Sequence, residues 1–259
     1  MSRIAAAFVA SKAENRAAFI AYLTAGFPDV SSFLAAAREL LEVADVLEVG
    51  LPYSDPLGDG PTIQRSSQHA LESGVTPAKT LKLVAQLRSE TDKPLLVMTY
   101  YNPVYTFPGG EGAFVRELKS AGADGVILPD LPPEEAEGLI PVARQVDLDT
   151  VFLVAPTSTE ARLRLVTSAC RGFVYAVSVT GVTGAREAVG SEVPELVRRV
   201  KAVSELPVAV GFGVSNASTA RPVAQAADGV VVGSALVRLV EGGSSPRDLA
   251  HEIADACKR

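Results

Sequence analysis

Short apolar segments alternate with amphipathic segments along nearly the whole sequence, and this alternation restricts the fold more than any other feature. Each of eight apolar segments has the length and composition of a buried strand, and each is followed by a segment with the apolar spacing of a helix. The eight predicted strands lie at residues 19–24, 45–49, 94–100, 125–128, 150–154, 173–177, 208–210 and 229–232. Strands that alternate with helices favour a parallel sheet with helices packed on its outside.

The number of these units and the chain length together predict a closed barrel. Eight strand–helix units in 259 residues fit a (β/α)8 barrel. An open doubly wound sheet would carry a glycine-rich fingerprint after its first strand, and none follows Thr24. No long linker or change of composition divides the chain. We therefore expect an α/β fold, a single TIM barrel domain over residues 1–259, with an extra N-terminal helix within residues 1–13 and additional helices.

Capping residues and prolines predict further helix limits. Ser31 or Ser32 can cap a helix that runs to about residue 43, and Thr159 can cap one that runs to residue 169. Residues 134–145 and 194–203 also have helical spacing. Asn102 and Pro103 indicate a loop after the third strand.

The charge balance and the cysteines bear on where such a chain works. A net charge of −6 argues against non-specific nucleic-acid binding. The apolar run at residues 4–10 is too short to span a membrane, and no cleavage pattern follows it. Cys170 and Cys257 lie far apart and belong to no pairing pattern, so we expect reduced thiols. These features predict a cytoplasmic protein.

Residues 46–64 carry the strongest signal for chemistry. Barrel enzymes keep their catalytic groups at the C-terminal ends of the strands and in the loops that follow them. Glu48 lies inside an apolar strand, where a carboxylate needs a partner, a shifted pKa or a catalytic role. Asp55 and Asp59 lie on the following loop, before a helix that opens at Pro61. Alternatively, Glu48 is salt-bridged, Asp59 caps the helix, and Asp55 forms a turn or contacts a partner.

Three glycine-rich segments near the end of the chain predict a phosphate site. They follow the sixth, seventh and eighth strands, at residues 178–184, 211–216 and 233–234. Glycine lets backbone N–H groups approach an anion, and barrels frequently bind phosphate with these late loops. Any one of them could instead serve only as a turn. As a set they predict a small phosphorylated substrate.

The residues missing from the strand ends exclude other chemistries. None of the lysines falls in or at the end of a predicted strand, which leaves a Schiff-base mechanism without a nucleophile. The two histidines lie in predicted helices, so we expect no metal site. Carboxylates, hydroxyls and tyrosines remain, and they support proton transfer on a substrate that supplies its own electron sink. Asp130 could merely fix a turn, and the tyrosines could fill the barrel.

The motif LEVGLPYSDPLGDGPTIQ at residues 47–64 closely resembles the signature of the tryptophan synthase α subunit family. The resemblance continues, in order, at residues 22–28, 98–103, 129–132, 181–184, 211–213 and 233–235. It implies a carbon–carbon lyase of tryptophan biosynthesis. This enzyme cleaves indole-3-glycerol phosphate to indole and glyceraldehyde 3-phosphate by a retro-aldol reaction. By resemblance, Glu48 is the general acid–base residue, and Asp59 binds the indole N–H.

The same resemblance implies the rest of the site. The expected phosphate ligands are Gly184, Gly213, Gly233 and Ser234. The expected indole pocket and its closing loop are formed by Tyr22, Tyr100, Ile127, Tyr175 and Thr183.

The resemblance also implies a partner. In the family, a β subunit that holds pyridoxal phosphate receives the indole within an α2β2 heterotetramer, so no cofactor is expected in this chain. Asp55, Pro56 and Asn102 are the expected partner contacts. The glycine-rich segment at residues 107–112 departs from the family pattern and lies next to the expected β contact, so the resemblance does not define the details of that interface. Alternatives are a free-standing lyase and a non-catalytic phosphate-binding activator, although the presence of both Glu48 and Asp59 argues against the latter.

Overall fold

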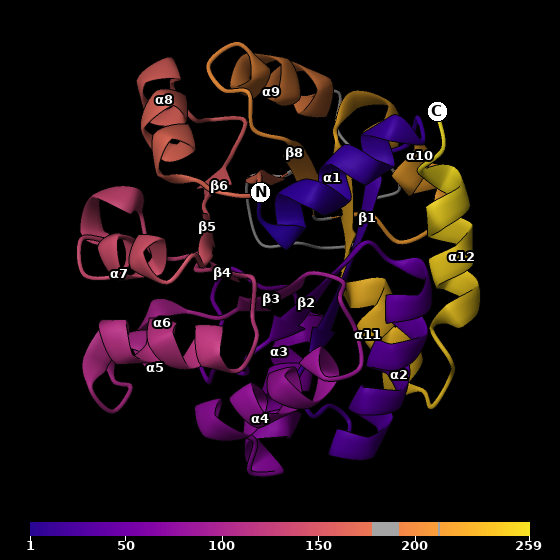
Figure 1. The fold of residues 1–259 in the computed structure, drawn as a ribbon. Coiled ribbons are helices and arrows are strands. Elements are labelled where there is room, and N and C mark those ends of the chain that lie inside the picture. The colour runs from indigo at the N-terminus through magenta and orange to yellow at the C-terminus, as the bar shows by residue number, and fades with distance from the viewer. Residues whose placement is uncertain (178–191, 212) are drawn as a thin grey trace.

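A parallel sheet forms the centre of the structure (Figure 1). The computed structural model describes residues 1–177, 192–211 and 213–259. Within them the sheet order is β5-β4-β3-β2-β1-β9-β8-β7-β6, and every neighbouring pair is parallel. The strands are β1 (Ala18–Thr24), β2 (Val46–Gly50), β3 (Leu95–Met98), β4 (Gly125–Ile127), β5 (Asp149–Val151), β6 (Leu153–Val154), β7 (Val174–Val177), β8 (Val208–Gly211) and β9 (Gly229–Val232).

The sheet closes into a barrel through the chain itself. The two ends of the strand order are β5 and β6, and only Phe152 separates them in sequence. The predicted strand at residues 150–154 therefore corresponds to β5 and β6 together, which form one strand of the barrel interrupted at Phe152. Val151 on one side of the break packs inside the barrel, whereas Phe152 packs outward against the helices. The predicted (β/α)8 TIM barrel is confirmed.

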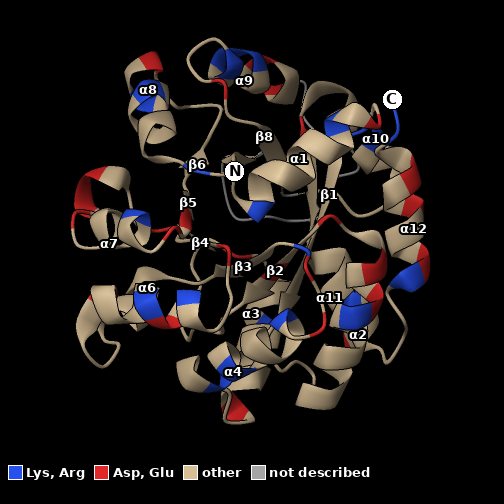
Figure 2. Cartoon of the chain, in the orientation of Figure 1, with Lys and Arg blue, Asp and Glu red and all other residues tan. Residues whose placement is uncertain are grey.

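Helices surround the strands, and the Lys, Arg, Asp and Glu residues occur mainly on the helices and loops (Figure 2). The helices are α1 (Arg3–Ala13), α2 (Val30–Val43), α3 (Pro61–Glu72), α4 (Pro77–Arg88), α5 (Tyr101–Tyr105), α6 (Gly110–Ser120), α7 (Ile140–Gln145), α8 (Glu160–Ala169), α9 (Glu192–Lys201), α10 (Ala217–Ala226), α11 (Ser234–Glu241) and α12 (Arg247–Ala256), with a 3-10 turn at Pro133–Glu135. Thr159 caps α8 as predicted, through a bond from the Arg162 N–H.

Three predicted helix limits were wrong. Asp29, rather than Ser31 or Ser32, caps α2, because its carboxylate accepts the Ser32 N–H at 2.9 Å. The segment that begins at residue 134 forms only the 3-10 turn and becomes α-helical at Ile140. The helix predicted to start at residue 194 already begins at Glu192.

The expected loop at residues 102–103 was also wrong, because these residues lie in α5. The Asp130 carboxylate accepts the Tyr101 N–H at 2.9 Å, and this bond satisfies an otherwise free donor at the helix start. A bond between residues 29 positions apart is invisible to local sequence patterns.

The N-terminal end of the barrel is closed by α1, which lies across the middle of the view in Figure 1. Ile4 and Phe8 of α1 belong to the apolar cluster inside the barrel. Gly125 and Gly229 at the strand starts make room for them, because a Cβ at Gly125 would stand 3.0 Å from Ile4 and one at Gly229 would stand 3.0 Å from Phe8. The opposite, C-terminal end is left for ligand binding.

Aspartates placed just before strands strengthen the same N-terminal end. Asp45, which precedes β2, accepts the Phe19 N–H of β1 at 2.8 Å, and Asp124, before β4, accepts the Leu95 N–H of β3 at 2.9 Å. Asp228, before β9, does the same for β8. Each carboxylate thus satisfies a backbone donor at the edge of the barrel, where β-pairing ends. We therefore infer that these three aspartates stabilise the fold and take no part in the candidate site.

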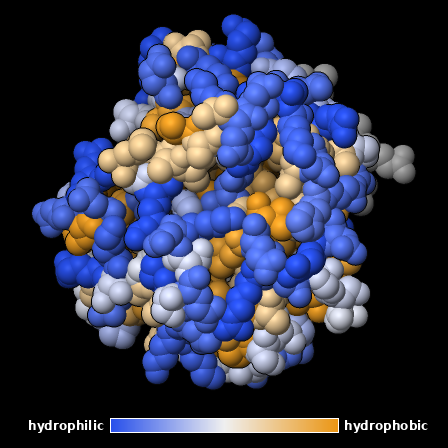
Figure 3. Space-filling view, turned by 45° about the vertical axis from the view of Figure 1, so that its right-hand side comes forward, coloured by the Kyte–Doolittle hydropathy of each residue, from blue (hydrophilic) through white to orange (hydrophobic). Residues whose placement is uncertain are grey.

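The surface shown in Figure 3 is mostly hydrophilic, with smaller apolar areas between the hydrophilic residues. Among the helices of the described residues, none has both the length and the apolar character that a membrane crossing requires. Cys170 and Cys257 are buried free thiols, as the sequence predicted.

Candidate active site

Glu48 is a buried carboxyl to which the described residues offer no hydrogen bond. It lies on β2 with 1% of its surface exposed, and neither carboxyl oxygen finds a hydrogen-bond partner in the described part of the chain. Burial raises the pKa of Glu48 to about 8, because the charged form loses its hydration. The salt-bridged alternative is wrong as far as the described residues go. At pH 7 this side chain is a neutral acid, available for proton transfer.

Asp59 lies on the loop after β2 and is held by Tyr100. The Tyr100 hydroxyl donates to Asp59 Oδ2 at 3.1 Å and accepts the Gly58 N–H at 3.0 Å. Burial raises the pKa of Asp59 to about 6, and the bond from Tyr100 opposes the rise. The N-cap of α3 is Gly60, without a side-chain cap, so Asp59 does not cap this helix. The capping alternative was therefore wrong.

Tyr22 and Tyr175 lie close to both carboxyl groups. Tyr22 is the register partner of Glu48 on the neighbouring strand β1, and Tyr175 lies on β7. Burial raises the pKa of each tyrosine, and the charges of Glu48 and Asp59 raise it further. Ile127 of β4 shares the inner cluster with Tyr175. Groups from four strands and one loop thus meet at this end of the barrel.

Two glycines make room for these tyrosines. The Tyr22 hydroxyl stands 2.1 Å from where a Cβ of Gly50 would lie, and the Tyr175 hydroxyl stands 2.2 Å from that position at Gly211. Each ring therefore extends over the end of the next strand, and a larger residue there would displace it. Glycine at the ends of β2 and β8 is required by close approach.

The described part of the predicted phosphate site adjoins Tyr22. Ser234 begins α11, and Gly233 precedes it at the C-terminal end of β9. A Cβ on Gly233 would stand 3.4 Å from Tyr22. Gly213, with φ +82°, follows the neighbouring strand β8. Free N–H groups at a helix start attract an anion. The predicted ligands Gly184 and Thr183 lie outside the described residues.

The predicted partner contacts lie at the same end of the barrel. Asp55 and Asn102 are exposed, whereas Pro56 is buried. Two large apolar side chains within three residues of them in sequence are exposed, Leu57 by 83% and Tyr105 by 65%. Exposed apolar side chains mark a protein interface where they gather into one patch. The sequence reasoning did not single out Leu57 or Tyr105.

Tyr53 is a further residue that the sequence reasoning missed. Its ring stacks on that of Tyr100, with centroids 5.3 Å apart and planes at 29°. The stack holds the loop after β2 against the end of β3 and so supports the bond from Tyr100 to Asp59. Its position inside the conspicuous segment 46–64 was the available signal.

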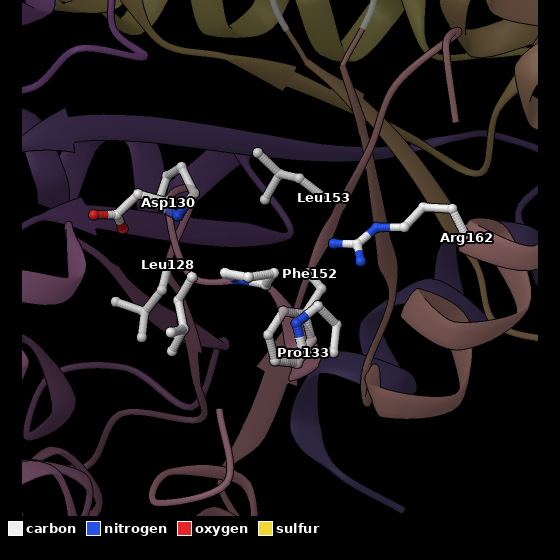
Figure 4. Close-up of a pocket in the computed structure, with 9 residues that line it drawn as sticks. Leu128, Asp130, Pro133, Phe152, Leu153 and Arg162 are labelled. Carbon is white, nitrogen blue, oxygen red and sulfur yellow. The ribbon is translucent and has the colours of Figure 1, made fainter. Parts of the chain in front are cut away.

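A pocket of about 170 Å³ lies between the loop that follows β4 and the break between β5 and β6 (Figure 4). Arg162 extends from α8 toward Phe152 and Leu153, while the Asp130 carboxylate points away from them. Arg162 forms an ion pair with Glu134. The pocket is lined by neither Glu48 nor Asp59 and is therefore peripheral to the carboxyl pair.

The strand ends carry few other reactive groups. No strand of the described residues contains a lysine. Within the same residues, no cluster of three or more His, Cys, Asp or Glu side chains is arranged to hold a metal ion. The arrangement supports proton transfer by Glu48, with Asp59 as a nearby carboxylate, on a ligand whose anionic end lies at α11.

Comparisons with known proteins agree with this geometry. The family model of the tryptophan synthase alpha chain matches residues 8–258. A tryptophan synthase alpha chain from Deinococcus radiodurans is 51% identical over 260 residues, which cover all of this chain and 96% of that protein. A chain in a structure of Mycobacterium tuberculosis tryptophan synthase is 47% identical with a TM-score of 0.92, covering 100% of this chain and 99% of that one.

A solved chain from Aquifex aeolicus is 40% identical, again with a TM-score of 0.92 and full coverage of both chains. Similarity of this extent, in sequence and in structure, covers the barrel and the segments that carry the candidate site. The chain belongs to the tryptophan synthase alpha chain family.

Proposed function

We propose that Glu48 and Asp59 carry out the lyase reaction of this family, the cleavage of indole-3-glycerol phosphate to indole and glyceraldehyde 3-phosphate. The observation that carries the proposal is the buried Glu48 carboxyl, which lacks a hydrogen-bond partner among the described residues, in the neighbourhood of Asp59 and the two tyrosines. Burying such a group without a partner costs stability, and catalytic sites are where this cost is commonly found.

Glu48 handles two protons in turn. As an acid it protonates C3 of the indole ring, which becomes tetrahedral and leaves positive charge on the ring. The resulting carboxylate then takes the proton from the hydroxyl group on the carbon attached to C3. That carbon becomes the aldehyde, the carbon–carbon bond breaks, and its electrons restore the aromatic ring. A pKa of about 8 suits both steps near neutral pH, and such transfers contribute about 10²–10⁴ in rate.

Asp59 stabilises the charged intermediate. With a pKa of about 6 it is ionised at pH 7, so it accepts the indole N–H and offsets the positive charge that develops on the ring. Tyr22, Tyr100, Ile127 and Tyr175 enclose the indole. The phosphate lies at the start of α11, held by Gly184, Gly213, Gly233 and Ser234, and Thr183 belongs to the loop that closes over the substrate.

The partner in this proposal is a β subunit that contains pyridoxal phosphate, in an α2β2 heterotetramer. Asp55 and Asn102 contact it on either side of the buried Pro56, and the exposed side chains of Leu57 and Tyr105 supply the apolar area that such a contact needs. The chain acts as one barrel domain in the cytoplasm and leaves the cofactor chemistry to its partner.

Two aspartates of one loop provide a matched test. We expect Asp59→Asn to lower the rate of indole release from indole-3-glycerol phosphate by about 10² or more, because the neutral amide cannot offset the ring charge. Asp55→Asn changes an exposed carboxylate four positions away and should leave the rate of the isolated chain unchanged. Equal rates for Asp59→Asn and wild type would contradict the proposed role of Asp59.

Adding the β subunit separates the alternatives. We expect it to raise the rate of indole formation strongly and Asp55→Asn to reduce that stimulation. A chain that is already fast alone and unaffected by the β subunit would be a free-standing lyase. A chain that releases no indole with or without the β subunit, yet activates it, would be a non-catalytic activator.

A further inference from the structure

A chain of three hydroxyl groups leads away from the candidate site. The Tyr22 hydroxyl lies 3.4 Å from Thr24 Oγ1, and Thr24 Oγ1 lies 2.7 Å from Ser66 Oγ. Ser66 Oγ in turn donates to the carbonyl oxygen of Ile63, at 2.9 Å in the first turn of α3. Tyr22 is 8% exposed, Thr24 1% and Ser66 0%, so water does not interrupt the chain.

The carbonyl at the far end fixes the direction of every proton. A carbonyl oxygen only accepts, and a hydroxyl has one proton to donate. Because Ser66 gives its proton to Ile63, it must accept from Thr24. Thr24 has then used its own proton and must accept from Tyr22. The Tyr22 oxygen therefore presents only lone pairs to the candidate site.

That oxygen lies close to the reacting groups. It stands over the end of β2, 2.1 Å from where a Cβ of Gly50 would be, and Tyr22 is the register partner of Glu48. The charges of Asp59 and Glu48 both act on Tyr22. Glu48 nevertheless makes no hydrogen bond to the Tyr22 hydroxyl.

We propose that the Tyr22 hydroxyl is an oriented acceptor that binds a hydroxyl group of the substrate's glycerol chain, with Thr24 and Ser66 as positioning residues. This inference rests on the proposed function. In that function Asp59 takes the indole N–H and α11 takes the phosphate. Glu48 takes the proton of the hydroxyl next to C3, so the second hydroxyl of the glycerol chain is the donor left without an acceptor. Gly233, at the phosphate end, lies against the Tyr22 ring.

The proton direction gives a sharp prediction. Tyr22→Phe should lower kcat/KM for indole-3-glycerol phosphate by roughly three- to tenfold, the usual size of one hydrogen bond. Ser66→Ala should also lower it, because Thr24 then loses its acceptor and is free to donate to Tyr22, so the Tyr22 oxygen is no longer held as an acceptor. In the double variant Ser66→Ala should add nothing, since no hydroxyl is left to orient. Ser67→Ala is the control, because Ser67 is a buried serine of α3 that is not one of the three linked hydroxyl groups. It should leave kcat/KM unchanged.

Binding of an analogue isolates the glycerol contact. An analogue that keeps the indole ring and phosphate but has an unsubstituted three-carbon chain should bind wild type and Tyr22→Phe with equal affinity. A weaker affinity in Tyr22→Phe would overturn the proposal, as would additive losses in the double variant. A shift of the pH profile of kcat without a change in KM would assign the Tyr22 contact to Glu48 and also overturn it. Failure of the proposed function is distinguishable, because wild type would then release no indole.

Discussion

Replacing Glu48 by glutamine should stabilise the folded protein at alkaline pH relative to wild type. The buried carboxyl has a pKa of about 8 in the folded chain, against 4.5 for an ordinary glutamate. Between these two values the unfolded chain loses its proton while the folded chain keeps it. Wild-type stability therefore falls as the pH rises through this window, and the loss is complete above pH 8. A glutamine is neutral throughout and lacks this dependence.

The magnitude follows from the two pKa values. Each unit of difference corresponds to about 1.4 kcal/mol. Between pH 5 and pH 8 the wild-type free energy of unfolding should therefore fall by about 3.5 kcal/mol more than that of Glu48→Gln, after allowing for partial titration at both limits. This is a large fraction of the stability of a typical domain.

Chemical denaturation at several pH values measures this difference. The chain has no tryptophan, so unfolding is best followed by circular dichroism. Glu117→Gln removes one carboxylate from the exposed side of α6 and controls for the change in net charge. Parallel stability curves for wild type and Glu48→Gln from pH 5 to pH 8 would refute the inference that Glu48 is held neutral by burial.

Three further predictions concern the same groups. The pH profile of kcat/KM should rise through about pH 6 as Asp59 ionises and fall through about pH 8 as Glu48 loses its proton; a profile flat across this range would contradict these roles. In wild type the hydrogen bond from Tyr100 lowers the pKa of Asp59, so Tyr100→Phe should raise this pKa and move the rising limb to higher pH. An unmoved limb would show that the bond does not affect the pKa of Asp59. Gly50→Ala should raise KM at least severalfold with the circular dichroism spectrum unchanged, since its Cβ would stand 2.1 Å from the Tyr22 hydroxyl; a normal KM would show that the ring moves freely.

The fold could be predicted largely from the sequence, because hydrophobic periodicity reports local structure. The eight predicted strands and the Thr159 cap follow from local patterns. What local patterns miss depends on distant contacts. The break at Phe152 and the helix at α5, which begins against Asp130, are of this kind.

The candidate site divides in the same way. Glu48 could be found because a carboxyl inside an apolar strand conflicts with its surroundings, which often marks function. Asp59 could not be separated from a helix cap on position alone. The bond from Tyr100, a residue 41 positions away, distinguishes the two. The hydroxyl contacts from Tyr22 through Thr24 to Ser66 join β1 to α3 across more than 40 positions, and no hydrophobic periodicity predicts them.

Proton transfer by Glu48 is the centre of this account, and the single-turnover rate of indole formation tests it most directly. Excess purified chain is mixed with indole-3-glycerol phosphate, for wild type and Glu48→Gln, so that product release does not limit the rate. We expect Glu48→Gln to be slower by at least about 10², with binding of glycerol 3-phosphate at the phosphate end unchanged. A Glu48→Gln rate within a few-fold of wild type would contradict the account.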